Sequence, residues 1–167
     1  SVYNITGIGT QTAALGLGGT PGLGAKAKEY DGSSWTGGGN YPTSGSNIGA
    51  AGTQTAAIGQ GGNNSGTEAA TYNGTAWTAI TDISNPRGEH GWSTNGTTTD
   101  TMAFGTTQTE KWDGSSWTEI VDNSTSRSSG FSVGTTSKAL YAGGNPGGVV
   151  TTEEFDHSIA AATFTSS

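Results

Sequence analysis

Residues 30–36 read "YDGSSWT", and two close copies follow: "YNGTAWT" at residues 72–78 and "WDGSSWT" at residues 112–118. The final tryptophan of the phrase recurs after 42 and then 40 residues, at Trp35, Trp77 and Trp117. A fourth copy, "FDHSIAA", begins at Phe155 and has Ala160 where the tryptophan is expected. A period of about 40 residues indicates a repeat architecture in which each unit is one supersecondary motif.

A second marker gives the same number of units. Each unit has a Gly-Thr pair, and nine residues after its glycine a second glycine closes a small apolar run. The pairs are Gly9 and Gly18, Gly52 and Gly61, Gly96 and Gly105, and Gly134 and Gly143. The constant separation predicts two hairpins of fixed length per unit, joined by loops of variable length.

The first unit shows what each hairpin contains. We expect strands at residues 4–9, 12–19, 25–30 and 34–38, with a tight turn at Asp31-Gly32 that supplies the positive φ a hairpin needs. Asn73-Gly74 and Asp113-Gly114 take the same turn role in the next two units. The sequence therefore predicts four antiparallel strands per unit.

Strand two of each unit has a bulky position and, next to it, a mostly small one. The bulky column is Leu15, Ile58, Met102 and Leu140, and the neighbouring column is Gly16, Gly59, Ala103 and Tyr141. Neighbouring residues of a strand point to opposite faces, so a large face would meet a smaller face when sheets stack.

The pattern resembles the kelch repeat of β-propellers, which has a double glycine after strand two and an aromatic residue and a tryptophan near strands three and four. The matching glycines are Gly18-Gly19, Gly61-Gly62 and Gly143-Gly144; the third unit departs, with Gly105-Thr106. The chain also resembles Gly/Thr-rich kelch-like proteins of marine bacteriophages. The resemblance implies an all-β, kelch-like propeller of four four-stranded antiparallel blades, at about residues 1–43, 44–86, 87–125 and 126–167.

On this model the recurring tryptophan is a packing wedge between adjacent blades; the alternative is a solvent-facing ring that stacks on sugars. Kelch propellers usually close with five to seven blades. We therefore expect either a small four-bladed ring or part of a larger ring completed by another chain or by further repeats. An open array exposes sheet faces and edges, which favours assembly with other protein chains.

Composition excludes several classes of function. The chain has 30 glycines, no cysteine, a formal charge of −7 and only six Lys and Arg, so nucleic-acid binding is not expected. No apolar run is long enough to cross a membrane as a helix. With no initiator Met and no signal peptide, we expect a mature, processed or fragmentary chain. Small, polar composition favours an extracellular or virion-surface location.

Enzyme chemistry, a metal site and a cofactor are not expected. The copper enzyme of the kelch class, galactose oxidase, uses a cysteine-linked tyrosine, and sialidase Asp boxes place Asp five residues before Trp, whereas Asp31 is four before Trp35. His90 and His157 lie in different units without a metal-binding motif. Glu153 and Glu154 are strand neighbours that point to opposite faces, which does not suit a shared acid/base site.

The loops after strands two and four vary in length and content, as functional loops on a repeated scaffold do. The candidate binding residues for a host or glycan partner are Asn40, Tyr41, Asn63, Arg87, Glu89, His90 and Arg127. The alternative is that these are solvated loop residues. The leading hypothesis is a non-catalytic attachment module of a virion or extracellular assembly; a secreted lectin and a degenerate propeller enzyme are the alternatives.

Overall fold

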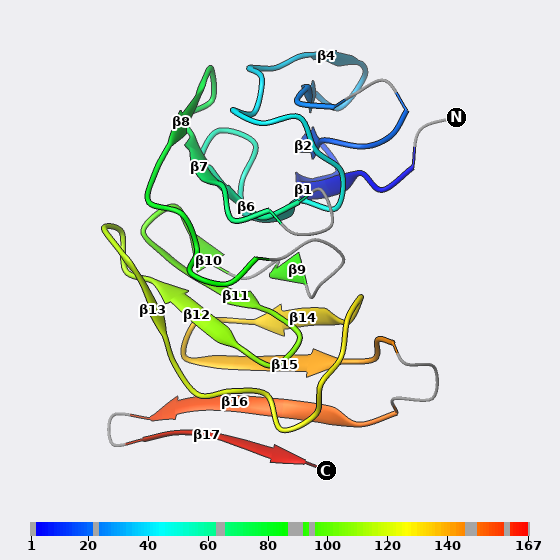
Figure 1. The fold of residues 1–167 in the computed structure, drawn as a ribbon. Helices are drawn as coiled ribbons and strands as arrows, with labels where there is room; N and C mark the ends of the chain where they lie inside the picture. The colour runs from blue at the N-terminus through cyan, green and yellow to red at the C-terminus, as the bar shows by residue number, and fades with distance from the viewer. Residues whose placement is uncertain are drawn as a thin grey trace.

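The computed structural model describes residues 3–21, 24–62, 66–86, 92–93, 96–145, 150–158 and 161–166. Its regular elements are all β-strands, which form four antiparallel sheets arranged as a four-bladed β-propeller (Figure 1). The predicted fold class is confirmed. Within the described residues there is no helix that could span a membrane.

Each blade is built from strands that follow one another in sequence. Blade 1 contains β1 (Thr6–Thr10), β2 (Ala13–Leu17), β3 (Ala27–Tyr30) and β4 (Trp35–Gly37). Blade 2 contains β5 (Gly49–Gly52), β6 (Ala57–Gln60), β7 (Ala69–Tyr72) and β8 (Trp77–Ala79). Blade 3 contains β10 (Gly96–Thr97), β11 (Asp100–Phe104), β12 (Thr109–Trp112) and β13 (Trp117–Glu119).

Blade 4 contains β14 (Phe131–Gly134), β15 (Lys138–Ala142), β16 (Thr152–Ser158) and β17 (Ala161–Ser166), and its sheet gains a fifth strand. That strand, β9 (Trp92–Ser93), pairs in parallel with β14. The first strand of blade 3 is β10, and Trp92 joins the sheet of blade 4.

The turn between strands three and four is held by the side chain of its first residue. The Asp31 carboxylate accepts hydrogen bonds from the backbone N–H groups of Ser33 and Ser34, both at 2.8 Å. Gly32 has φ +95°, as the predicted turn requires. Asp113 holds the turn of blade 3 with the same distances, and the side-chain carbonyl of Asn73 does so in blade 2. The recurring phrase is therefore a side-chain-stabilised turn followed by a tryptophan.

The double glycines adopt one conformation in three blades. Gly18, Gly61 and Gly143 have φ of +69°, +69° and +68°, and the glycine after each has φ between +108° and +111°. Side chains with a Cβ rarely adopt this region, which explains why the pair recurs. Gly105 lies instead in a short turn, where its N–H donates to the Gln108 carbonyl at 2.8 Å.

Each blade has two faces, which we name by their strand-two residue. The Leu face carries the bulky column, Leu15, Ile58, Met102 and Leu140. The Trp face carries the column Gly16, Gly59, Ala103 and Tyr141 and, in blades 1 to 3, the recurring tryptophan. In each blade that has a successor, the Leu face packs against the Trp face of that successor, giving three buried layers.

A tryptophan lies over the small residue of its own blade in these layers. A Cβ built on Gly59 would lie 3.4 Å from the Trp77 ring and 3.4 Å from Leu17 of blade 1. The Trp77 ring also lies 5.1 Å, centroid to centroid, from the rings of Tyr41 and Tyr72. Trp117 occupies the same place between blades 2 and 3. Trp77 and Trp117 therefore pack in the layers between adjacent blades.

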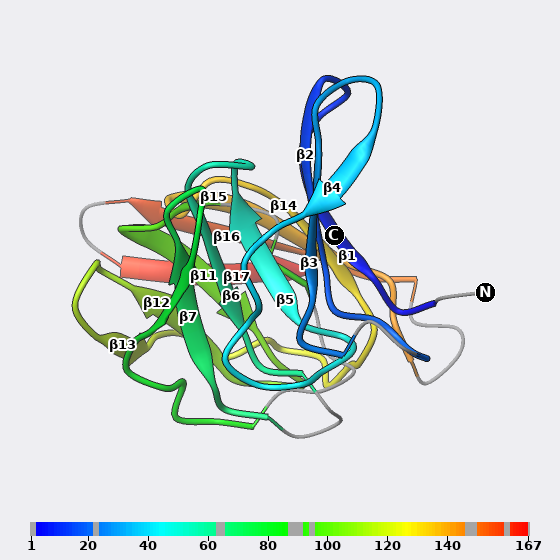
Figure 2. The same cartoon turned by 90° about the horizontal axis from the view of Figure 1, so that it is seen from above.

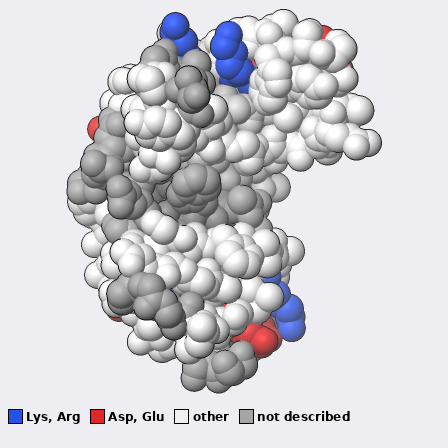
Figure 3. Space-filling model, turned by 90° about the vertical axis from the view of Figure 1, so that its right-hand side faces the viewer, with Lys and Arg blue, Asp and Glu red and all other residues white. Residues whose placement is uncertain are grey.

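The ring is open between blade 4 and blade 1. The space-filling view has a C-shaped outline, with a hollow between the upper lobe, which contains blade 1, and the lower lobe, which contains blade 4 (Figure 3). Seen from above, β2 and β4 of blade 1 stand apart from the other blades (Figure 2). Trp35 is 54% exposed, because no described blade packs on the Trp face of blade 1. The expectation that Trp35 is a wedge between two blades of this chain is therefore wrong.

We expect Trp77→Ala to lower the free energy of unfolding by about 3–5 kcal/mol, the usual cost of deleting a large packed aromatic side chain. Trp35→Ala is the matched control, because the same residue type in the same repeat position is exposed; it should cost about 1 kcal/mol or less in the monomer. Equilibrium denaturation in dilute solution measures both. Equal losses for the two variants would contradict the wedge assignment.

Hydrogen bonds from the Ser34 and Ser33 backbone and the Ser33 hydroxyl lower the pKa of Asp31 to about 2, and equivalent bonds lower that of Asp113 to about 2. A folded-state pKa below the unfolded value stabilises the fold above the unfolded value, near 3.8, and this contribution is lost as pH falls through 2. We expect carboxyl NMR titrations of both residues to have midpoints near 2. A midpoint near 3.8 would contradict the turn geometry.

The matched variant for this test is Asp31→Asn with Asp113→Asn, since Asn73 already holds the equivalent turn of blade 2. This double variant should be less stable than the parent at neutral pH, because it lacks the two ionised carboxylates, and it should lose less stability than the parent between pH 4 and pH 2.

Candidate functional site

The predicted loop-face site is not assembled in the described structure. Asn40 is exposed in the loop after β4, as expected, whereas Tyr41 and Arg127 are buried. The other four candidates, Asn63, Arg87, Glu89 and His90, lie outside the described residues.

Tyr41 belongs to the layer between blades 1 and 2. Its N–H donates to the Ala25 carbonyl at 2.6 Å, and its hydroxyl donates to the Glu68 carbonyl at 3.1 Å. Its ring is 2% exposed and meets Trp77 edge to face. Burial also raises the pKa of the Tyr41 phenol. The expectation that this ring is offered to a partner is wrong, because it fills the space above Gly59.

Arg127 is fully buried beside Glu153, with 2.6 Å between its Nη2 and the Glu153 Oε1. It also donates to the Thr151 carbonyl at 2.7 Å, and its guanidinium carbon lies 5.3 Å from the centre of the Tyr141 ring. The expectation that Arg127 binds a partner from the loop face is therefore also wrong. The guanidinium instead ties the segment before β14 to β16.

Glu153 connects this ion pair to the loop that arrives from blade 3. Its carboxylate accepts from the backbone N–H groups of Ser124 at 2.6 Å and Thr125 at 3.1 Å. Glu110, at the equivalent position of blade 3, accepts from Ser84 at 2.8 Å in the loop from blade 2. A carboxylate in a buried strand column needs such donors. Glu110 and Glu153 occupy equivalent positions in their repeats, and this alignment is the sequence signal that could have placed Arg127 in the core.

The exposed apolar side chains point to a different site. Among the described residues, five large hydrophobic side chains exposed by 39% or more lie on the two faces that border the open part of the ring. They are Ile5 and Trp35 on the Trp face of blade 1, and Phe131, Val133 and Leu140 on the Leu face of blade 4. In the interior blades the corresponding faces are buried.

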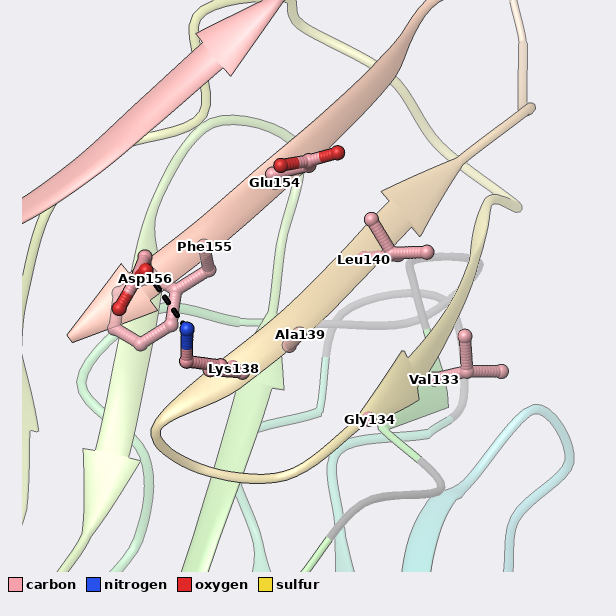
Figure 4. A pocket seen from close by; sticks show the side chains of 8 residues that line it. All are labelled: Val133, Gly134, Lys138, Ala139, Leu140, Glu154, Phe155 and Asp156. Atoms are coloured by element: carbon pink, nitrogen blue, oxygen red, sulfur yellow. Dashed lines mark hydrogen bonds and ion pairs between the residues drawn. The ribbon is translucent and has the colours of Figure 1, made fainter. Parts of the chain in front are cut away.

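The Leu face of blade 4 has a pocket bounded by three strands (Figure 4). Val133, Leu140 and Glu154 project from β14, β15 and β16 on the same side of the sheet. Lys138 and Asp156 lie at one end of the pocket and form an exposed ion pair of 3.2 Å. The result is an apolar surface with acidic groups along its β16 edge.

The Trp face of blade 1 is the counterpart at the other end of the chain. Ile5, Gly16, Lys28 and Trp35 line an apolar hollow. A Cβ on Gly16 would lie 3.5 Å from the Trp35 ring, so the tryptophan covers the glycine as Trp77 covers Gly59. Tyr30 supports the Trp35 ring, with 5.1 Å between centroids. The face has the residues that a packed layer uses, although no part of the chain that the structure describes packs on it.

The candidate site is this pair of exposed apolar faces on a four-bladed β-propeller. Within the described residues, no three His, Asp or Glu side chains are grouped so that they could hold a metal ion. No protein-family model matches the chain, and no curated protein matches its sequence. The two faces were missed at the sequence level because Leu140 and Trp35 follow the same repeat pattern as their buried counterparts.

We expect Arg127→Ala to lower the free energy of unfolding by about 3–5 kcal/mol, because it leaves the buried Glu153 carboxylate without its cation. Lys138→Ala is the control: it breaks the exposed pair with Asp156 and should cost about 1 kcal/mol or less. Thermal and denaturant unfolding measure both. A small loss for Arg127→Ala, with binding to a surface partner abolished, would return Arg127 to the loop-face site.

Proposed function

We propose that this protein is a non-catalytic structural module of an extracellular or virion-surface assembly, related to kelch-repeat proteins. The observation that carries the proposal is the pair of unpaired faces at the two ends of the blade array. Terminal units of a repeat array need a polar outer face to stay soluble alone. Blade 1 and blade 4 instead present the apolar surfaces that other blades bury.

The second part of the proposal concerns attachment. The end faces join the module to other protein chains, and the variable loops are left free to contact a host surface or a glycan. Asn40 is exposed on this loop side, and the predicted residue Arg87 follows β8 in the sequence. The tight turns have no such freedom, since one added residue would shift the strand register and turn core side chains outward.

The lectin alternative has lost support. It needs aromatic and cationic side chains that are open to sugars, and two of the candidate binding residues that both hypotheses share, Tyr41 and Arg127, are buried. Trp35 is exposed, but it lies on an apolar end face and not among the loops. The attachment proposal therefore retains the loops as its recognition surface and assigns the exposed aromatic residues to assembly.

We expect Asn40→Ala combined with Arg87→Ala to reduce binding to glycan-coated or host-cell surfaces while circular dichroism stays unchanged. Ser33→Ala with Ser115→Ala, in the exposed tight turns, is the matched control and should bind normally. Surface binding by immobilised glycan panels or labelled cells measures both. If the control pair abolishes binding and the loop pair does not, the proposed recognition face is wrong.

A further inference from the structure

The junction of blades 1 and 2 shows how a Trp face is recognised by a Leu face. The Gln54 side chain, in the Gly-Thr turn of blade 2, donates to the Tyr30 carbonyl at 2.7 Å and to the Ala14 carbonyl at 3.2 Å. The Tyr72 hydroxyl of blade 2 donates to the Glu29 carboxylate of blade 1. Trp77 packs in the same layer as Leu15 and Leu17. Two polar contacts therefore set the register around an apolar centre.

Blade 1 has an equivalent of each side-chain hydrogen-bond donor that blade 2 uses in that junction. Gln11 lies in the turn "GTQT" at residues 9–12, and Gln54 lies in the identical sequence at residues 52–55. Tyr30 pairs with Trp35 across β3 and β4 as Tyr72 pairs with Trp77 across β7 and β8. Gln11 and Trp35 are exposed, so both remain open to a partner.

Blade 4 repeats the acceptors that blade 1 offers. Leu140 lies opposite Glu154 as Leu15 lies opposite Glu29. Ala139 lies opposite Phe155 as Ala14 lies opposite Tyr30, so the carbonyls bound by Gln54 have equivalents at Ala139 and Phe155. Ala139, Leu140, Glu154 and Phe155 line the pocket of Figure 4. That pocket is therefore the counterpart, in blade 4, of the place where the Gln54 side chain sits on blade 1.

We propose that the partner of these faces is a second copy of this chain, docked head to tail, with the Trp face of its blade 1 on the Leu face of blade 4. In this interface Gln11 of the second copy enters the pocket, its Tyr30 donates to Glu154, and its Trp35 covers Leu140. The inference rests on the proposed function and names the chain with which the module assembles.

Charge favours this pairing over one that joins two like faces. Lys28 lines the hollow on blade 1, whereas Glu154 and Asp156 border the pocket on blade 4, with Lys138 paired to Asp156. Docking blade 1 on blade 4 brings Lys28 to an acidic edge, and docking blade 4 on blade 4 brings carboxylates together. The contact is heterologous, so copies add in one direction and form either a closed ring of chains or an open filament.

The main experiment uses one variant for each face. Leu140→Asp disables the Leu face of blade 4, and Trp35→Ser disables the Trp face of blade 1. Light scattering coupled to size exclusion should find higher oligomers for the parent and monomers for each variant alone. An equimolar mixture of the two variants should give a heterodimer, because one intact face of each kind remains. Ser115→Ala, in the exposed tight turn of the interior blade 3, should assemble like the parent.

The residue-level contacts are tested separately. Gln11→Ala should weaken assembly about tenfold or more while leaving the monomer folded. The chain has no cysteine, so Tyr30→Cys and Glu154→Cys can be introduced in separate chains. Under a mild oxidant, the mixture should give a disulfide-linked heterodimer. The two substitutions in one chain should give intermolecular ladders, whereas a fast-migrating cross-linked monomer would show that blade 4 closes on blade 1 of the same chain.

Besides a cross-linked monomer, three results would overturn the inference: a parent that stays monomeric at its highest soluble concentration, variants that oligomerise normally, or single-face variants whose mixture stays monomeric. A monomeric parent that still binds glycan or host surfaces through its loops would leave the proposed function standing without self-assembly. Oligomers that bind no such surface would support self-assembly and contradict the proposed recognition by the loops.

Discussion

The packing of a bulky aliphatic face on a face of small residues capped by tryptophan is the interaction on which the rest of the structure depends. A chain with so few large side chains cannot form one central core, and it forms three layers, each shared by two blades. Gly59 leaves the room that Trp77, Tyr41 and Leu17 fill. Close packing of this kind gives a stable interior from small residues, because every void is occupied by a side chain of the neighbouring blade.

The same constraint explains the ends of the array. A layer needs two faces, so four blades in an open ring form three layers and leave two faces over. Trp35 and Leu140 have the chemistry of their buried counterparts without a blade to cover them. In a repeat protein, the free energy of folding is approximately the sum of contributions from the units and from the interfaces between them. A partner that covers an exposed face can therefore add a further stabilising interface. The proposed assembly through these faces would use the same packing that stabilises the blades.

Polar contacts complete each junction and determine its direction. Glu110 and Glu153 receive the backbone of the loop from the preceding blade, and Gln54 donates to the backbone of blade 1. Buried carboxylates and amides are tolerated only with partners, so each fixes one register between blades. Arg127 belongs to this set, since it neutralises Glu153 inside blade 4. Two of the predicted binding residues, Tyr41 and Arg127, therefore serve packing.

The sequence by itself determined the strands, the turns and the number of blades. These depend on local requirements: a positive φ at Gly32, a turn-forming side chain at Asp31, and two-residue alternation along each strand. Tertiary structure alone decided which repeated residues are covered. Trp35 and Trp77 occupy the same position in their repeats, and only the presence or absence of a preceding blade makes one exposed and the other a wedge. Burial depends on which blades are neighbours in space, and the repeat pattern is the same in blades with and without such a neighbour.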